Sequence, residues 1–259
     1  MSSGPRTPSG TNDAEGSGSS PAPERNLQRL INAVQYFAIF GIVALLAFNR
    51  VTHDYIQNID NTWRGFIGAA PGDASYQWFV PMALQHGFDT IGAVAICLVL
   101  IIVCLVFKRY WHALFAGLSL ALVAGGLVQG FKHLFNRERP ADDLENELWS
   151  SVFPVDHGSF PSGHSAAAAV FAIMFLVLVP WQWKRLRAAI PYIGAALVLA
   201  MMWQRTLTNA HWLSDTVAGA ALGLGGALLL WWFMQPWLDA EQREHLPAAL
   251  DAPESREPQ

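Results

Sequence analysis

Six apolar runs, separated by short polar connections, constrain the fold of this chain more than any other feature. They lie at about residues 30–48, 91–107, 113–131, 162–179, 190–203 and 213–233. Most of them approach the roughly 20 residues that a helix needs to cross the hydrocarbon core of a bilayer. The fifth run is short unless its helix continues into the polar residues that follow. The sequence therefore predicts an all-α bundle of six transmembrane helices.

Composition supports one membrane domain. The chain is 53% hydrophobic and 14% charged, with 11 Trp, and its charged residues gather in the tails and connections. No basic stripe of the kind that nucleic-acid-binding proteins carry is present, so we exclude that class. We expect a disordered tail at residues 1–24, a membrane domain at residues 25–238 and a loose polar tail at residues 239–259.

Lysine and arginine next to the apolar runs predict the orientation, because cytoplasmic connections carry an excess of both. With six alternating spans, one side of the membrane receives Arg25, Arg29, Lys108, Arg109, Lys184, Arg185, Arg187 and Arg243. We therefore expect both termini in the cytoplasm of a bacterium and the connections at residues 49–89 and 140–161 outside. Residues 75–88 either form an interfacial helix or lengthen the second span on the outer side.

A loop meets the fourth apolar run at Phe160–Ser165, which reads Phe-Pro-Ser-Gly-His-Ser. Pro161 suits the first turn of a helix, where its missing N–H is not needed. The following residues, Ser162, Gly163 and His164, then lie where free backbone N–H groups and the helix dipole favour a phosphate. His164 is the side chain here that can exchange a proton near neutral pH.

Two further polar clusters lie at outward ends of the predicted spans. One runs from Lys132 to Pro140 and includes Arg139, and the other begins at Arg205. Cations at the edge of apolar segments are costly, which indicates a function. Together, Lys132, Arg139 and Arg205 would offset the charges of a terminal phosphate, and the arginine fork fits two of its oxygens. Each alone could instead be a snorkelling residue at the membrane edge.

The second of these clusters also contains His211 and Asp215. Residues four apart share one face of a helix start, so the carboxylate can accept the ring N–H and fix the tautomer. The opposite ring nitrogen would then be free as a nucleophile. With His164 as general acid, the three clusters supply the groups for phosphoryl transfer without a metal.

These three clusters resemble the three signature motifs of the type 2 phosphatidic acid phosphatase (PAP2) superfamily. The matching patterns are Lys132-x6-Arg139-Pro140, Pro161-Ser162-Gly163-His164 and Arg205-x5-His211-x3-Asp215. The superfamily includes bacterial membrane lipid phosphatases, and the resemblance covers roughly residues 30–237. One position departs from it, because Gln204 stands where the family usually has Ser before the arginine of the third motif.

The resemblance implies a lipid phosphatase that needs no cofactor. His211 would attack phosphorus and form a phosphohistidine, with Asp215 holding its ring. His164 would protonate the departing lipid oxygen and then activate water. The phosphate-binding residues would be Lys132, Arg139, Ser162, Gly163 and Arg205. The substrate would be a lipid phosphate or diphosphate in the outer leaflet, such as polyprenyl diphosphate, phosphatidate or phosphatidylglycerophosphate.

Two other functions remain open at this stage. The chain could pass the phosphoryl group from His211 to another lipid, or it could bind lipid without catalysis. The acidic run of Asp142, Asp143, Glu145 and Glu147, with His157, is a weaker candidate for a metal site. We interpret that run as a solvated outer loop, because its carboxylates follow no spacing that would converge on an ion.

Overall fold

A computed structural model gives the structure of residues 26–154 and 158–245. Within these ranges the chain is helical, apart from turns and one isolated β-bridge between Asp143 and Leu148. The all-α expectation is therefore confirmed for the described residues. The predicted tail at residues 1–24 and the last part of the C-terminal tail lie outside them.

The helices follow the predicted apolar runs, with additions in the connections. In chain order they are α1 (Leu27–Phe48), α2 (His53–Ile67), the 3-10 turn η1 (Ser75–Gln77), α3 (Phe79–Phe88), α4 (Thr90–Val106), α5 (Tyr110–Leu118), the π-helical η2 (Ser119–Leu127), α6 (Val128–Phe135), α7 (Gly163–Leu178), α8 (Lys184–Leu207) and α9 (Leu213–Glu244). The stretch Tyr110–Phe135 is one continuous helix.

Several helices are long and apolar enough to make this a multi-pass membrane protein. By length and composition, four of the described helices could each cross a bilayer: Leu27–Phe48, Tyr110–Phe135, Lys184–Leu207 and Leu213–Glu244. A fifth span is possible if α3 and α4 count together, although they are bent by 73°. Helix α7, which corresponds to the fourth predicted span, has 16 residues and is shorter than these four helices. Length alone thus supports four or five spans among the described residues.

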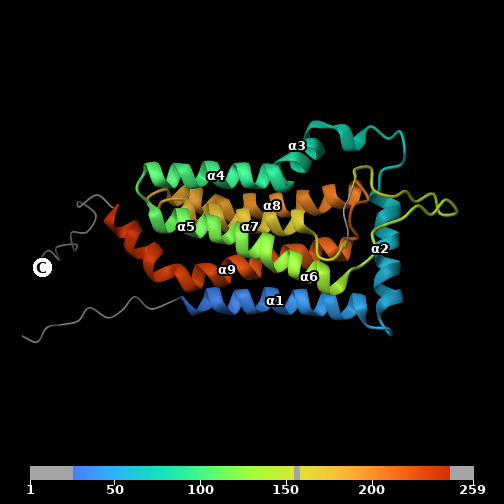
Figure 1. The fold of residues 1–259 in the computed structure, drawn as a ribbon, viewed down its shortest axis with the longest axis horizontal. Coiled ribbons are helices and arrows are strands. Elements are labelled where there is room, and N and C mark those ends of the chain that lie inside the picture. Colours follow the sequence, from blue (N-terminus) through green and yellow to red (C-terminus); the bar gives the residue numbers. More distant parts are fainter. Residues whose placement is uncertain (1–25, 155–157, 246–259) are drawn as a thin grey trace, which may run out of the picture.

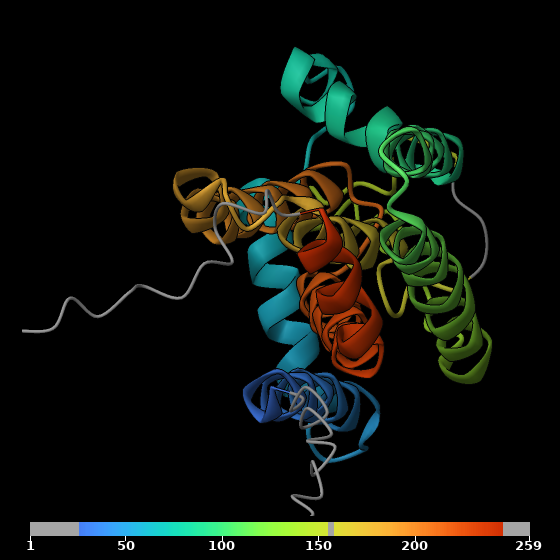
Figure 2. The same ribbon diagram turned by 90° about the vertical axis from the view of Figure 1, so that its left-hand side faces the viewer.

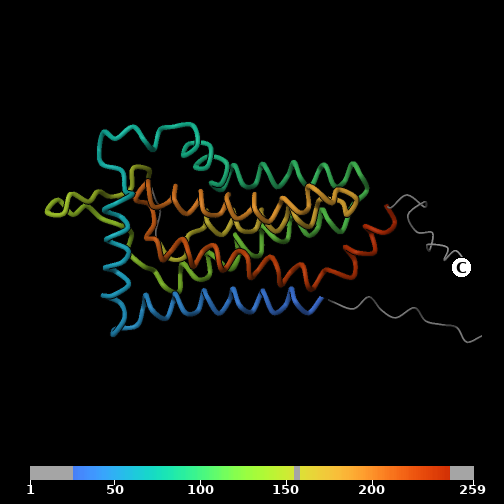
Figure 3. Tube along the Cα trace, turned by 180° about the vertical axis from the view of Figure 1, so that it is seen from behind, coloured from blue at the N-terminus to red at the C-terminus, as the bar shows by residue number. Residues whose placement is uncertain are grey.

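The long helices run side by side, and α2 lies across one end of the bundle (Figure 1). A view along the bundle shows α7 and α9 between α1 on one side and α4 with α5 on the other (Figure 2). Seen from behind, the start of α1 and the end of α9 lie at the end away from α2 (Figure 3). Most of α7 is buried, including the run from Ser165 to Met174.

Small residues bring α9 against the start of α7. A Cβ on Gly219 would lie 2.2 Å from the Ser162 carbonyl oxygen, and one on Gly223 would lie 2.4 Å from that of Ala166. Both distances are shorter than any real contact, so these positions need glycine for the two backbones to approach. Small residues in α9 thus allow close helix packing, which fixes the start of α7.

The structure differs from the sequence expectations in the connections. The connection at residues 49–89 contains the helix α2, which the apolar pattern did not predict. Helix α8 is longer than the fifth apolar run, because it begins at Lys184 and ends at Leu207. Residues 239–244 are not a loose tail. They continue α9, and Glu241 is buried there, with its Oε2 atom 2.6 Å from Nδ1 of His112.

Candidate active site

A cavity of about 720 Å³ is lined by residues of all three predicted clusters. Its polar wall contains Lys132, Arg139, His164, Arg205 and His211. Gln85, Asp89, Thr90 and Gln129 also line it, and its apolar part includes residues of α4, α5 and η2: Ala93, Val94, Gly117, Leu120, Ala121, Ala124 and Gly125. A cationic end joined to an apolar channel suits a molecule with an anionic head and a hydrocarbon chain.

His211 lies in the short loop between α8 and α9 and is 5% exposed. Its Nδ1 atom is 2.8 Å from the backbone carbonyl oxygen of Ser159. A carbonyl can only accept, so Nδ1 carries the proton and donates it to Ser159. Nε2 therefore keeps its lone pair, which is the tautomer a histidine nucleophile requires.

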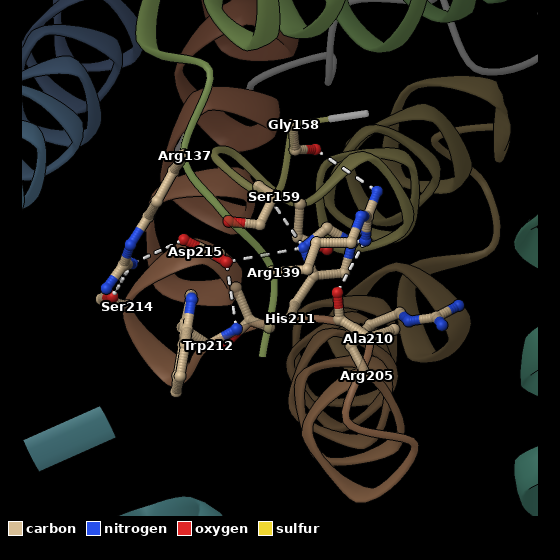
Figure 4. A network of polar contacts seen from close by, with 12 residues as sticks. Arg137, Arg139, Gly158, Ser159, Arg205, Ala210, His211, Trp212, Ser214 and Asp215 are labelled. Carbon is tan, nitrogen blue, oxygen red and sulfur yellow. Dashed lines mark hydrogen bonds and ion pairs between the residues drawn. The ribbon is translucent and has the colours of Figure 1, made fainter. Parts of the chain in front are cut away.

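Asp215 lies close to His211, but it does not accept the ring N–H of His211 as the sequence analysis expected. Its Oδ2 atom is 3.7 Å from Nδ1 of His211 and accepts a hydrogen bond from the Trp212 N–H at 3.0 Å. Its Oδ1 atom accepts from Nη1 of Arg137 at 2.7 Å. The carboxylate thus stabilises the ring through charge at close range, while the Ser159 carbonyl takes the N–H (Figure 4).

Arg137 is a residue of the site that the sequence analysis did not identify, because its partners Asp60 and Asp215 are 77 and 78 positions away in the chain. Nη1 also donates to Ser214 at 2.7 Å, and Nη2 donates to Asp60 Oδ2 at 2.9 Å. Asp60 itself accepts from the N–H and the hydroxyl of Ser214, at 2.9 and 2.6 Å. Helix α2 is thereby bonded to the first turn of α9, next to His211.

Two of the predicted cations share one hydrogen-bond acceptor close to His211. Nζ of Lys132 and Nη2 of Arg139 both donate to the carbonyl of Gly158, at 3.0 and 3.3 Å. Nη1 of Arg139 donates to the carbonyl of Ala210 at 2.6 Å and lies 3.4 Å from Nε2 of His211. Positive charge therefore surrounds the ring nitrogen that would attack phosphorus.

The third predicted cation, Arg205, is 2% exposed. Nη1 donates to Oε1 of Gln85 at 2.8 Å, and Nη2 donates to the hydroxyl of Thr208 at 3.3 Å. Its Nε atom is buried without a hydrogen-bond partner. No carboxylate of the described residues pairs with this guanidinium. It is a buried cation at the cavity wall whose charge is not balanced by a neighbouring anion.

The loop-to-helix junction is close to the expected one but is shifted by one position. Pro161 precedes the N-cap of α7 and does not lie in its first turn, because the N-cap is Ser162. The Ser162 hydroxyl accepts the N–H of Ser165 at 3.4 Å and is fully buried, away from the cavity wall. Gly163 and His164 do line the cavity, and Nε2 of His164 is buried without a hydrogen-bond partner.

Burial and nearby cations both lower the pKa of His211. Burial has the largest effect, followed by the charges of Arg139, Arg205 and Lys132, and the bond to Ser159 opposes them in part. The pKa is held well below its usual value of 6.5. The imidazole is therefore neutral at physiological pH, as a nucleophile must be.

The acidic loop uses its first two carboxylates to support its own backbone. Asp142 accepts the N–H of Ser150 at 2.6 Å, and Asp143 accepts from the side chain of Asn146 at 2.9 Å. Among the residues that the structure describes, no group of three His, Cys, Asp or Glu side chains converges as metal ligands would. His157, which the sequence associated with this loop, lies outside the described residues.

Comparisons with known proteins find a matching family model and relatives of part of the chain. Residues 112–239 match the family model of the PAP2 superfamily. Lipid A 1-phosphatase of Rhizobium johnstonii is 32% identical over 118 residues, which are 44% of this chain and 45% of that protein. Lipid A 1-phosphatase of Porphyromonas gingivalis is 30% identical over 119 residues, 44% of this chain and 22% of that protein. The match thus spans less than half the length of these curated relatives.

A solved structure shares the fold. The crystal structure of a transmembrane PAP2-type phosphatidylglycerolphosphate phosphatase from Bacillus subtilis superposes with a TM-score of 0.63. The superposition covers 79% of this chain and 96% of that one, at 20% sequence identity. The similarity therefore extends to helices that precede residue 112.

Proposed function

Because this chain carries a PAP2 superfamily domain at residues 112–239, we propose that it is a membrane lipid phosphatase that removes a terminal phosphate from a lipid phosphate or diphosphate. The observation that carries the proposal is Arg205. A buried cation without an anionic partner is costly, and this one faces a cavity that also contains His164 and His211. An anionic substrate would balance its charge.

The proposed reaction has two steps. In the first, Nε2 of His211 attacks phosphorus, an N–P bond forms, and the bond from phosphorus to the lipid oxygen breaks. His164 gives its proton to that departing oxygen. In the second, His164 takes a proton from water as the water oxygen attacks phosphorus, the N–P bond breaks, and inorganic phosphate and neutral His211 are released. Asp215 and the Ser159 carbonyl stabilise the ring that becomes positively charged in between.

The cations would hold the phosphoryl oxygens and stabilise the charge that spreads over them in the transition state. Lys132, Arg139 and Arg205 all line the cavity, and Gly163 adds the N-terminal end of α7. General acid catalysis by His164 contributes roughly 10²–10⁴ in rate, so most of the acceleration falls to these preorganised groups. Ser162 would act indirectly, by capping α7 and keeping Gly163 in place.

The apolar part of the cavity would hold the start of the lipid chain, between α4 and the η2 segment. The headgroup remains open among polyprenyl diphosphate, phosphatidate and phosphatidylglycerophosphate. The lipid A 1-phosphatase relatives add a phosphorylated sugar to these candidates.

The membrane topology belongs to the same proposal. If α7 and the α3–α4 pair each cross the bilayer, six spans result, and both termini face the cytoplasm. The lysines and arginines between the spans support this orientation. The cavity would then open at the outer face, where the headgroup of a lipid in the outer leaflet is within reach. The folded unit would extend from residue 25 to the end of α9.

The test is phosphate release by purified protein in detergent from a panel of these lipids, with His211→Ala as the comparison. We expect release by the wild-type protein, with or without a chelator, and none by the variant, whose circular dichroism should be unchanged. With substrate labelled at the terminal phosphate, quenching should trap protein-bound label that is stable in alkali and lost in acid.

The alternatives give other results. Label that moves to an added acceptor lipid without release of free phosphate would identify a phosphotransferase. Full activity in His211→Ala would remove the proposed nucleophile. Loss of activity with chelator, restored by added metal, would reject the metal-independent mechanism. Binding of lipid phosphates without turnover by the wild-type protein would leave a lipid-binding function.

A further inference from the structure

Gln85 reaches the active-site cavity from outside the three sequence clusters. It lies on α3, the short helix that is bent by 73° against α4, and it lines the cavity beside Arg205. The bend depends on Gly92, because a Cβ there would lie 1.8 Å from the carbonyl oxygen of His86. The backbone thus turns α3 back over the polar end of the cavity.

The contacts of Gln85 fix the orientation of its amide. Oε1 lies 2.8 Å from Nη1 of Arg205 and 3.1 Å from Nε2 of Gln204. A guanidinium only donates, so the atom that faces Arg205 is the amide oxygen. The NH₂ group then points away from both partners. The structure gives it no hydrogen-bond partner among the described residues, so two donors are left at the wall of the cavity.

Gln204 is the anchor of this arrangement. It is fully buried in α8 and does not line the cavity. Its side chain extends to α3, which a serine at the same position would be too short to do. The departure from the usual family residue therefore has a structural consequence: this chain gains an interhelical amide pair that holds Gln85 next to Arg205.

We propose that Gln85 determines headgroup specificity by donating a hydrogen bond to an acceptor oxygen next to the phosphate that is removed. This inference rests on the proposed phosphatase function. A second phosphate or a sugar oxygen supplies such an acceptor, and a simple alkyl phosphate lacks one. Gln85 acts on substrate choice, whereas the cations act on the phosphate common to all substrates.

The test compares kcat/KM for three substrates: farnesyl phosphate, farnesyl diphosphate and a diacylated glucosamine 1-phosphate. In Gln85→Met, which keeps the size of the side chain but removes the amide, we expect a loss for all three, because Arg205 loses an acceptor. For farnesyl diphosphate or for the glucosamine lipid, the loss of kcat/KM should exceed the loss for farnesyl phosphate by roughly tenfold or more, so the preference for that substrate over farnesyl phosphate should fall.

Two more variants make the result specific. Gln204→Ser removes the anchor without touching the cavity and should shift the same preference in the same direction, by a smaller factor. His86→Ala changes the neighbouring residue on α3, whose side chain is 67% exposed, and should leave the preference unchanged. If the additional loss of kcat/KM occurs only with the diphosphate, a second phosphate is the acceptor. If it occurs only with the glucosamine lipid, a sugar oxygen is the acceptor.

An equal loss on all three substrates in Gln85→Met overturns the inference, because Gln85 would then only support Arg205. An unchanged preference in Gln204→Ser, in protein that retains its thermal stability, contradicts the anchoring role. Failure of the wild-type protein to release phosphate from any of the three substrates would instead reject the proposed function. The two failures are therefore distinguishable.

Discussion

Nη1 of Arg137 lies 2.7 Å from Oδ1 of Asp215, and Nη2 of the same guanidinium lies 2.9 Å from Oδ2 of Asp60. All three side chains are nearly or fully buried. One arginine thus neutralises two carboxylates, one from α2 and one from α9. This arrangement fixes Asp215 beside His211 and makes Arg137 a positioning residue of the site.

Replacing Arg137 with Gln should lower both the stability of the protein and its rate of turnover. Two buried carboxylates would lose their cation, and breaking a buried ion pair from one side costs about 3–5 kcal/mol. We expect a lower Tm in detergent and a lower kcat, because Asp215 would no longer be held. Thermal unfolding and initial rates on the same preparation measure both effects.

Arg137→Lys is the matched control, since it keeps the charge and loses the fork that reaches both carboxylates. It should fall between the wild-type protein and Arg137→Gln in both measurements. A wild-type Tm and kcat in Arg137→Gln would show that Asp60 and Asp215 do not depend on this cation.

His164→Gln should reduce turnover in a way that depends on the leaving group. With an alkyl phosphate, loss of the general acid should cost roughly 10²–10⁴ in kcat. With p-nitrophenyl phosphate, whose leaving group departs as a stable anion, the loss should be much smaller. His133→Gln, an exposed histidine on α6, should have no such pattern. Equal losses on both substrates would reject His164 as the acid.

The depressed pKa of His211 predicts activity that persists in mild acid. The nucleophile must be neutral, and protonation of His211 begins only well below pH 6.5. The acid limb of kcat/KM that belongs to this group should therefore lie below pH 6.5. Removing a nearby cation raises the pKa, so Arg139→Gln should move that limb toward neutral pH.

Lys184→Gln is the control for this shift, because Lys184 begins α8 at the far end from Arg205. It should leave the limb in place. The same pKa shift also makes folding sensitive to acid, since the unfolded chain binds a proton on this histidine below pH 6.5 while the folded protein does not. An acid limb that stays in place in Arg139→Gln would contradict the assigned cause.

Filling the apolar part of the cavity should act on the lipid chain and spare the chemistry. Gly125 lines the cavity, and the nearest atom to a Cβ built there is a backbone oxygen at 3.6 Å, an ordinary contact. Gly125→Leu should therefore fold. Displacing two methylenes of the chain, at about 0.8 kcal/mol each, should lower kcat/KM for long-chain lipids roughly tenfold.

Gly130→Leu is the matched control, because Gly130 lies on the same continuous helix with nothing within 4 Å of its Cβ position and does not line the cavity. It should leave kcat/KM unchanged. Hydrolysis of p-nitrophenyl phosphate, which has no chain, should be unaffected in both variants. If Gly125→Leu lowered kcat/KM equally for long-chain lipids and p-nitrophenyl phosphate, the lipid chain would not bind in this part of the cavity.

The features that the sequence predicted are those with a strong local pattern. Long apolar runs indicate helices whatever their partners are, so the six hydrophobic helices were found, although their lengths support only four or five spans. The polar clusters at their ends were recognisable because cations and histidines are rare there. In the structure, Lys132, Arg139, His164, Arg205 and His211 line one cavity.

What the sequence missed depends on partners that are distant in the chain. Helix α2 is amphipathic, with its apolar residues three or four positions apart, so it forms no apolar run. The role of Asp60 follows only once α2 packs against α9. The Ser159 carbonyl that orients His211 is a backbone atom, which no side-chain pattern reveals. The pairing of Gln204 with Gln85 joins residues that are 119 positions apart.

Asp60 on α2 carries a practical warning for protein engineering. The region that matches the family model begins at residue 112, yet this carboxylate, which accepts two hydrogen bonds from Ser214 at the start of α9, comes from upstream of it. A chimera that transplants only residues 112–239 onto another scaffold would leave behind the clamp on its own nucleophile loop. Donor segments should start no later than α1.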